Sequence, residues 1–178
     1  MSLFLFETDV VVKKDKEGVV DQLERLKTDL ERQEASLIEV QLAKDVTSAF
    51  IIVETENVQE TTQTVEDNHF KVTLSKEVRL VGETLENVKQ ENDVVNYLVE
   101  WNLPEDLTMD QYLNRKKQNS VHYTDVPEVE FARTYVCEDM TKCLCFYDAP
   151  DVDAVKRARK AVKAPIDAIT ELGNNKKE

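Results

Sequence analysis

The stretch Tyr135-Val-Cys-Glu-Asp-Met-Thr-Lys-Cys-Leu-Cys-Phe-Tyr-Asp-Ala-Pro150 decides how the rest of the chain can be interpreted. It predicts a β-hairpin, with one strand over 129–137 and its partner over 142–147, that runs directly into a helix. Asp148-Ala-Pro-Asp-Val-Asp153 predicts the helix start, because an acidic cap is followed by a proline in the first turn. The same stretch holds all three cysteines of the chain.

Composition limits the classes of partner. The 178 residues carry a net charge of −13, and 41% of them are hydrophobic, as in a globular protein. Such an acidic surface repels phosphate groups, so we expect neither nucleic acid nor a membrane surface as a partner. No secretory signal is recognisable, and three cysteines, an odd number, suit a reducing compartment better than a disulfide scaffold. We therefore expect an acidic cytoplasmic protein.

Hydrophobic periodicity predicts the same order of elements twice. The first half predicts strand, helix, two strands, weak helix and strand over 3–12, 19–30, 36–43, 48–54, 56–67 and 69–76. The second half predicts strand, short helix, the hairpin, helix and closing strand over 94–101, 109–113, 129–147, 148–163 and 165–172. Each half is thus predicted to have the order βαββαβ.

The two halves also match residue by residue. Lys44-Asp-Val-Thr-Ser-Ala-Phe-Ile-Ile52 aligns without a gap with Glu138-Asp-Met-Thr-Lys-Cys-Leu-Cys-Phe146, and Val58 falls on Val152. Phe4-Leu-Phe-Glu7 matches Tyr97-Leu-Val-Glu100. We interpret this as an internal repeat, with repeats over 1–80 and 94–173, a linker over 81–93 and a tail over 174–178.

The expected fold class is α+β, with tandem ferredoxin-like βαββαβ repeats. Each antiparallel sheet would bury its free face against the other, as in a dimeric-type α/β barrel formed within one chain. Alternation along the hairpin then predicts that Leu144 and Phe146, with Phe50 and Ile52 in the first repeat, face the helices. The residues predicted to face the space between the sheets are Arg133, Tyr135, Cys137, Cys143, Cys145 and Tyr147. Within this set, Cys145 is predicted to lie opposite Arg133 or Tyr135.

Cys145-Phe-Tyr-Asp-Ala-Pro150 and Ala164-Pro-Ile-Asp-Ala-Ile-Thr-Glu-Leu172 resemble the corresponding segments of a small bacterial ferredoxin-like family. The resemblance covers about residues 94–172. It implies a dimeric α/β-barrel fold, largely unknown function and, for the best-described type, nickel binding and a response to nickel. Members usually carry a histidine in the second strand, where this chain has Arg133, and an arginine is no metal ligand and repels a cation.

The candidate site residues follow from these assignments. The predicted ligand-binding residues are Glu100, Arg133, Tyr135, Cys145 and Tyr147, and the arginine favours a small anionic ligand. The predicted ligands for a divalent metal such as nickel are Cys145, Glu100 and His122. Next to Arg133, the Cys145 thiol would have a lowered pKa, but the cysteines can also be read as small buried core residues. The basic run from 156 to 163 is predicted to be the solvated end of a helix.

No complete catalytic motif is present, so the sequence leaves three functions open. The first is a non-enzymatic protein that binds a small ligand or a metal ion between its two sheets. The second is a cofactor-poor monooxygenase or isomerase that uses Glu100 or His122 as its base. The third is a structural or interaction module without a ligand. Neither the reaction nor the oligomeric state can be derived from the sequence.

Overall fold

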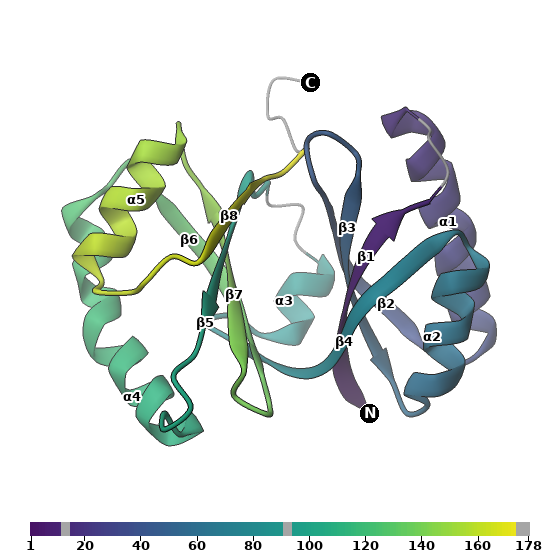
Figure 1. Cartoon of the computed structure of the whole chain (residues 1–178), viewed down its shortest axis with the longest axis horizontal. Helices are drawn as coiled ribbons and strands as arrows, with labels where there is room; N and C mark the ends of the chain where they lie inside the picture. The colour runs from purple at the N-terminus through teal and green to yellow at the C-terminus, as the bar shows by residue number, and fades with distance from the viewer. Residues whose placement is uncertain (12–14, 91–93, 174–178) are drawn as a thin grey trace. The chain divides into compact units, whose positions relative to one another are not determined.

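The computed structural model describes residues 1–11, 15–90 and 94–173 (Figure 1). The expected tail, residues 91–93 of the expected linker and the expected end of the first strand at Val12 lie outside the described residues. The chain divides into two compact units, Met1–Val78 and Arg79–Glu178. In the part of the chain that the structure describes, no helix has the length and apolar character required to cross a membrane.

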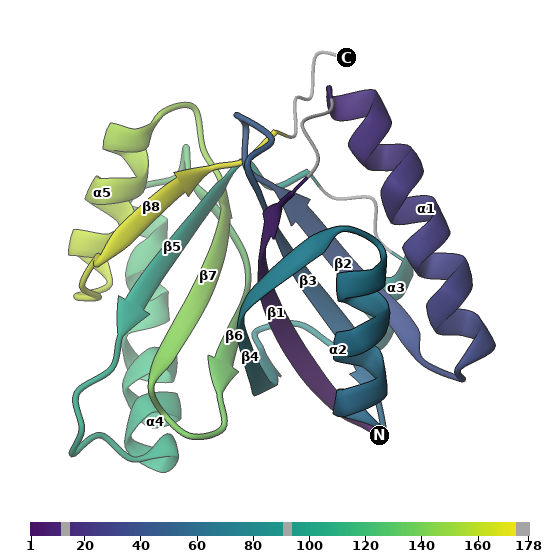
Figure 2. The same cartoon turned by 45° about the vertical axis from the view of Figure 1, so that its right-hand side comes forward.

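The first unit is an antiparallel sheet with two helices. Its elements are β1 (Ser2–Val10), α1 (Lys16–Arg32), β2 (Ser36–Leu42), β3 (Ser48–Thr55), α2 (Val58–Asp67) and β4 (Phe70–Val81), whose last residues belong to the second unit. The strands follow the order β2-β3-β1-β4. Figure 2 shows α1 and α2 on the same face of this sheet.

The second unit repeats that arrangement. After α3 (Leu85–Gln90), which lies in the expected linker, the elements are β5 (Tyr97–Asn102), α4 (Met109–Asn119), the 3-10 turn η1 (Ser120–Asp125), β6 (Glu130–Cys137), β7 (Lys142–Asp148), α5 (Val152–Ala161) and β8 (Ala168–Glu171). The order β6-β7-β5-β8 is that of the first unit, with α4 and α5 on one face (Figure 1). The expected α+β fold of tandem ferredoxin-like units is confirmed; how their sheets pack against each other stays a prediction.

The turns between the central hairpin strands have the same geometry in both units. Asp45 Oδ1 accepts hydrogen bonds from the backbone N–H and the hydroxyl of Thr47, at 3.1 and 2.6 Å. Asp139 Oδ1 accepts the same pair from Thr141, at 3.1 and 2.7 Å. The residue between the two partners has a φ of 62° in the first turn and 61° in the second. A carboxylate that closes its own turn in this way fixes where each hairpin reverses.

The register of the second hairpin differs from the expected one. Val136 pairs with Cys143, and Thr134 therefore lies opposite Cys145. Arg133 lies opposite Phe146, beyond which a bulge shifts the pairing. The prediction that Arg133 or Tyr135 lies opposite Cys145 was wrong, because the turn sets a pairing register that differs by one residue from the predicted one. A shift of one residue places a side chain opposite the other face of its partner strand.

The predicted face assignment was inverted for β7 and for its counterpart β3, whereas Arg133 and Tyr135 of β6 lie on the face away from the helices, as predicted. Cys143, Cys145 and Tyr147 pack in one core cluster with Tyr112 of α4 and Val155 of α5, so they face the helices. In the first unit Ile51, rather than Phe50 or Ile52, belongs to the cluster that includes α1 and α2. Both alternating sets of β7 are apolar and buried, so hydrophobicity could not distinguish the two faces.

Candidate functional site

A pocket opens within the second unit, between the helices and the face of the sheet that carries the cysteines. Its internal volume is about 30 Å³, enough for about two water molecules, and about 390 Å³ when its open mouth is included. It is lined by Trp101, Tyr112, Arg115, Lys116, Asn119, Ser120, Tyr123, Cys145, Arg159, Val162, Lys163 and Ala164. These residues come from β5, β7, α4, η1 and the C-terminal end of α5.

Arg159 is the central residue of the pocket. Its side chain is 2% exposed, although arginine is rarely buried in a core. Nη1 donates hydrogen bonds to the Cys145 sulfur at 3.3 Å and to the Tyr147 hydroxyl at 3.1 Å. Nη2 donates to the Pro165 carbonyl oxygen at 2.5 Å. The buried Nε has no hydrogen-bond partner among the described residues. The guanidinium therefore retains its Nε–H as a donor that a bound group could use.

The helix α5 positions this arginine on its inner face. Asp151 caps the helix by accepting a hydrogen bond from the Ala154 N–H at 2.8 Å. Val155, Ala158 and Arg159 are all buried, whereas Lys160 is exposed. The prediction that the whole basic run is solvated was wrong for Arg159, because spacings of three and four residues place it with the apolar residues that face the sheet.

Cys145 lies at the inner end of the pocket and is 1% exposed. Thr134 donates a hydrogen bond to its sulfur at 3.2 Å, in addition to the one from Arg159. The pKa of the Cys145 thiol is lowered well below its ordinary value, chiefly by a hydrogen bond from the Cys143 thiol. The charges of Lys116 and Arg159 also lower this pKa, whereas burial raises it. These contacts therefore favour the thiolate form of Cys145.

Two tyrosine hydroxyls extend the network toward the mouth. The Tyr123 and Tyr147 oxygens lie 2.6 Å apart, within hydrogen-bond distance. Tyr123 also stacks on Phe131, with ring centroids 5.2 Å apart and ring planes at 7°. Burial raises the pKa of both tyrosines, so their hydroxyls keep their protons and remain hydrogen-bond donors.

The mouth of the pocket is cationic although the protein is acidic overall. Arg115 lies over the Trp101 ring at 5.4 Å and donates a hydrogen bond to the Lys163 carbonyl oxygen at 3.2 Å. Lys116 lies over the Phe131 ring, 4.4 Å from its centroid. The aromatic rings hold these long side chains near the opening, where their charges attract anions.

The structure brings together two of the five residues that were expected to bind a ligand. Cys145 lines the pocket and Tyr147 is linked to it through Arg159. Glu100 and Tyr135 both pair with Leu144, and Arg133 pairs with Phe146, so all three lie on the opposite face of the sheet. That these three residues bind a ligand stays a prediction.

The three predicted metal ligands do not lie together. Glu100 forms an ion pair with Lys142, with Oε1 and Nζ 2.6 Å apart, and it lies on the face of the sheet away from Cys145. His122 is an exposed residue of η1, and its Nδ1 lies 3.5 Å from Asp125. Within the described residues, no group of three or more His, Cys, Asp or Glu side chains could hold a metal ion. The donor set at this site does not fit nickel, because cations surround its one thiolate.

Sequence reasoning missed Arg159, Thr134 and Tyr123. The spacing of Val155, Arg159 and Val162 was a usable signal for Arg159, since four and three residues separate positions on one helix face. No signal in the sequence indicated Thr134, because its proximity to Cys145 depends on the hairpin register. Tyr123 belongs to a turn whose course no periodic pattern predicts.

Comparison with known proteins relates one repeat to a family and the whole chain to a fold. Residues 97–172 match the family of nickel responsive protein SCO4226-like. SCO4226 from Streptomyces coelicolor A3(2) is 18% identical, with a TM-score of 0.37, over 43% of this chain and 93% of its own. No curated protein sequence matches the chain.

Several solved structures match almost the whole chain, among them the following two. A “putative monooxygenase” from Lactobacillus acidophilus NCFM is 10% identical, with a TM-score of 0.54, over 98% of this chain and 94% of its own. A heme-binding protein from Thermus thermophilus is 8% identical, with a TM-score of 0.52, over 96% of this chain and 91% of its own. At such low identity these matches show the fold alone. The resemblance expected from the sequence is confirmed: the second repeat is similar to the nickel responsive SCO4226-like family over residues 97–172.

Proposed function

We propose that the chain is a ligand-binding protein whose second repeat binds a small anion in the pocket around Arg159. The observation that carries this proposal is the buried guanidinium, whose Nε has no hydrogen-bond partner among the described residues. The anionic ligand expected from the sequence is retained, but Arg159 replaces Arg133 as the residue that favours it.

Charge and geometry support an anion over a cation or a neutral ligand. A carboxylate or an inorganic oxyanion accepts several hydrogen bonds and pairs well with a guanidinium. Arg115, Lys116 and Lys163 line the pocket and add positive charge. The internal volume of about 30 Å³ limits the enclosed part of the ligand to a few atoms. Formate, acetate, nitrate and phosphate are therefore the first probes to test.

Isothermal titration with these four anions at low ionic strength tests the proposal. We expect saturable one-to-one binding for at least one of them, weakened about tenfold or more by Arg159→Lys, which keeps the charge but removes the planar donor group. Lys160→Gln on the exposed face of the same helix is the matched control and should leave binding unchanged. Absence of saturable binding up to about 10 mM, or equal loss in both variants, contradicts the proposal, since weaker binding has little specificity.

The other functions receive less support from this site. Nickel lacks a fitting donor set, as described above. A haem is far larger than the pocket, and no histidine of the described residues lines it. For a monooxygenase or isomerase, neither suggested base reaches the pocket, because Glu100 is paired with Lys142 on the other face and His122 does not line it. We place the protein in the cytoplasm, where its three free cysteines would stay reduced.

A further inference from the structure

We propose that Cys145 reacts with hydrogen peroxide, so that the pocket of the second repeat is also a thiol-based peroxide site. This reaction does not depend on the proposed anion binding, because hydrogen peroxide is neutral and needs only access to the sulfur. Of the three cysteines, Cys145 alone lines the pocket.

The donors around the sulfur support this chemistry. Thr134 Oγ1 and Arg159 Nη1 approach the Cys145 sulfur at 3.2 and 3.3 Å, from a strand and a helix respectively. Two such donors stabilise a thiolate, which is the nucleophilic form of cysteine. They can also donate to the oxygen that leaves during the reaction, as preorganised donors do for developing negative charge. Arg159 lines the pocket, and its buried Nε has no hydrogen-bond partner among the described residues, so it is a third donor that a molecule in the pocket could use.

The dimensions of the pocket favour a small oxidant. Cys145 is 1% exposed, so the sulfur is reached only through the pocket. The internal volume of about 30 Å³ accommodates about two water molecules, and hydrogen peroxide consists of two oxygen atoms and their hydrogens. A hydroperoxide with a bulky organic group exceeds that space. The site should therefore distinguish peroxides by size.

The oxidation balances, with hydrogen peroxide as the oxidant and the Cys145 sulfur as the group that loses two electrons. The thiolate sulfur attacks one peroxide oxygen, the S–O bond forms, and the O–O bond breaks. Cys145 becomes a sulfenic acid, and the hydroxide that leaves takes a proton from solvent to give water.

The electrostatic environment is consistent with this role. A hydrogen bond from the Cys143 thiol and the charges of Lys116 and Arg159 lower the pKa of Cys145, against burial. The pKa of Cys143 is raised, chiefly by its hydrogen bond with Cys145 and by burial. The pKa of Cys137 is also raised, mainly by burial. The reactive form is therefore concentrated on one of the three sulfurs.

The test treats the full-length native protein with hydrogen peroxide, removes the excess with catalase, and then unfolds the protein in urea with dimedone, which traps sulfenic acids but is too large for the folded pocket. Mass spectrometry then locates and times the label. We expect labelling at Cys145, none in Cys145→Ser, and a rate about tenfold lower in Thr134→Val, as for the loss of one hydrogen bond to a charged group. Cys137→Ser is the matched control and should label at the native rate. Cumene hydroperoxide, which is bulky, should react at least about tenfold more slowly than hydrogen peroxide if access is limited by the pocket.

Three results would overturn the proposal. They are no label in the native protein, labelling of Cys137 or Cys143 at the rate of Cys145, and a faster reaction in urea than in buffer. The last would mean that the thiol reacts only after unfolding. The assay uses a buffer without the four probe anions, so its failure leaves the result of the anion titration intact. Conversely, a protein that binds no anion can still give the Cys145 label.

Discussion

The two repeats have the same arrangement of strands and helices, which we call the frame. They differ in the side chains on the sheet and helix surfaces that face each other, which we call the wall: these are apolar in the first repeat and largely polar in the second. β3 and α2 correspond residue by residue to β7 and α5, since Ser48 and Val58 match Lys142 and Val152 at the starts of these elements. In the first repeat the wall consists of Ala49, Ile51, Val53 and Val65, all buried. At the corresponding positions the second repeat has Cys143, Cys145, Tyr147 and Arg159, also buried.

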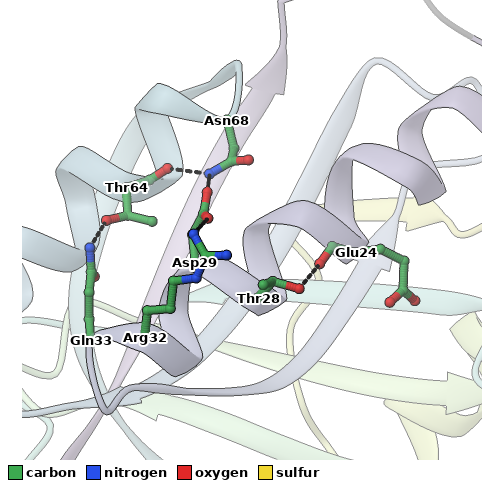
Figure 3. A network of polar contacts seen from close by, with 7 residues as sticks. All are labelled: Glu24, Thr28, Asp29, Arg32, Gln33, Thr64 and Asn68. Atoms are coloured by element: carbon green, nitrogen blue, oxygen red, sulfur yellow. Dashed lines mark hydrogen bonds and ion pairs between the residues drawn. The ribbon is translucent and has the colours of Figure 1, made fainter.

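The side-chain hydrogen bonds near this wall of the first repeat are of two kinds. Thr61 Oγ1 of α2 donates to Thr55 Oγ1 of β3 at 2.9 Å, and others join the two helices. Asn68 Nδ2 donates to Asp29 Oδ2 at 3.1 Å, and Gln33 Nε2 donates to Thr64 Oγ1 at 2.5 Å (Figure 3). These bonds join α1 to the α2 region at the border of the apolar cluster. Hydrogen bonds of this kind hold two helices together without placing a charge in the core.

The comparison teaches that the fold does not need the polar wall. Apolar side chains at the same positions complete the first repeat, so the thiol, the phenol and the guanidinium of the second repeat are not required by the frame. A buried ion pair is weak evidence for stability, because desolvation offsets most of the attraction. The polar wall is better explained by function, and three experiments can break or sharpen the comparison.

The largest expected effect comes from placing the arginine of the second repeat in the first. Val65→Arg would bury a guanidinium among Leu26, Ile51 and the other apolar residues of that cluster. We expect the free energy of unfolding to fall by about 4 kcal/mol or more, because the charge has no thiolate or phenol beside it. Urea unfolding followed by circular dichroism measures this loss.

Gln63→Arg is the control for that variant, because it adds the same side chain to the exposed face of α2 next to Asp67. A change within about 0.5 kcal/mol is expected there. If Val65→Arg is as stable as this control, the first repeat tolerates a buried arginine, and the difference between the two walls does not indicate a function.

An intermediate effect is expected when the apolar pair of the first repeat is placed in the second. Arg159→Val alone should cost about 3–5 kcal/mol, because it removes the buried cation that donates hydrogen bonds to the Cys145 sulfur and the Tyr147 hydroxyl. The double variant with Cys145→Ile should cost less than the sum of the single variants by about 1–3 kcal/mol. Urea unfolding of all four proteins completes the cycle, with Lys160→Val as a surface control. Additivity within about 0.5 kcal/mol would mean that the two residues are not coupled.

The smallest effect is a pH dependence that the first repeat lacks. Between the lowered pKa of the folded state and pH 9.0, the ordinary value for a thiol, the unfolded chain holds a proton on Cys145 that the folded protein has released. Stability should therefore rise with pH from the lowered folded pKa up to about 9, by at most about 1.4 kcal/mol per pH unit. Cys145→Ser should lose this slope in urea unfolding at several pH values, whereas Cys137→Ser should keep it. An unchanged slope in Cys145→Ser would place the titration elsewhere.

Much of the frame could be predicted from the sequence because periodicity and turn chemistry are local. The alternating strands, the helix after Asp148 and the paired Asp-x-Thr turns all predicted elements that the structure contains. The expected cap of that helix was wrong, because Asp151 and not Asp148 accepts the capping hydrogen bond. Boundaries differed where local signals were weak. The closing strand β8 is limited to Ala168–Glu171, and the helix expected to be weak, α2, is regular and capped by Asn57.

The sequence by itself determined the order of elements, the repeated architecture and the resemblance of the second repeat to a known family. Only the tertiary structure decided which face of β7 meets the helices, because both of its alternating sets are buried. It also decided that Arg159, not Arg133, adjoins Cys145. A register is fixed by the closure of a turn and by packing across the sheet, and a shift of one residue exchanges the two faces. The pattern of hydrophobic residues therefore predicts the frame, and packing between distant segments creates the site.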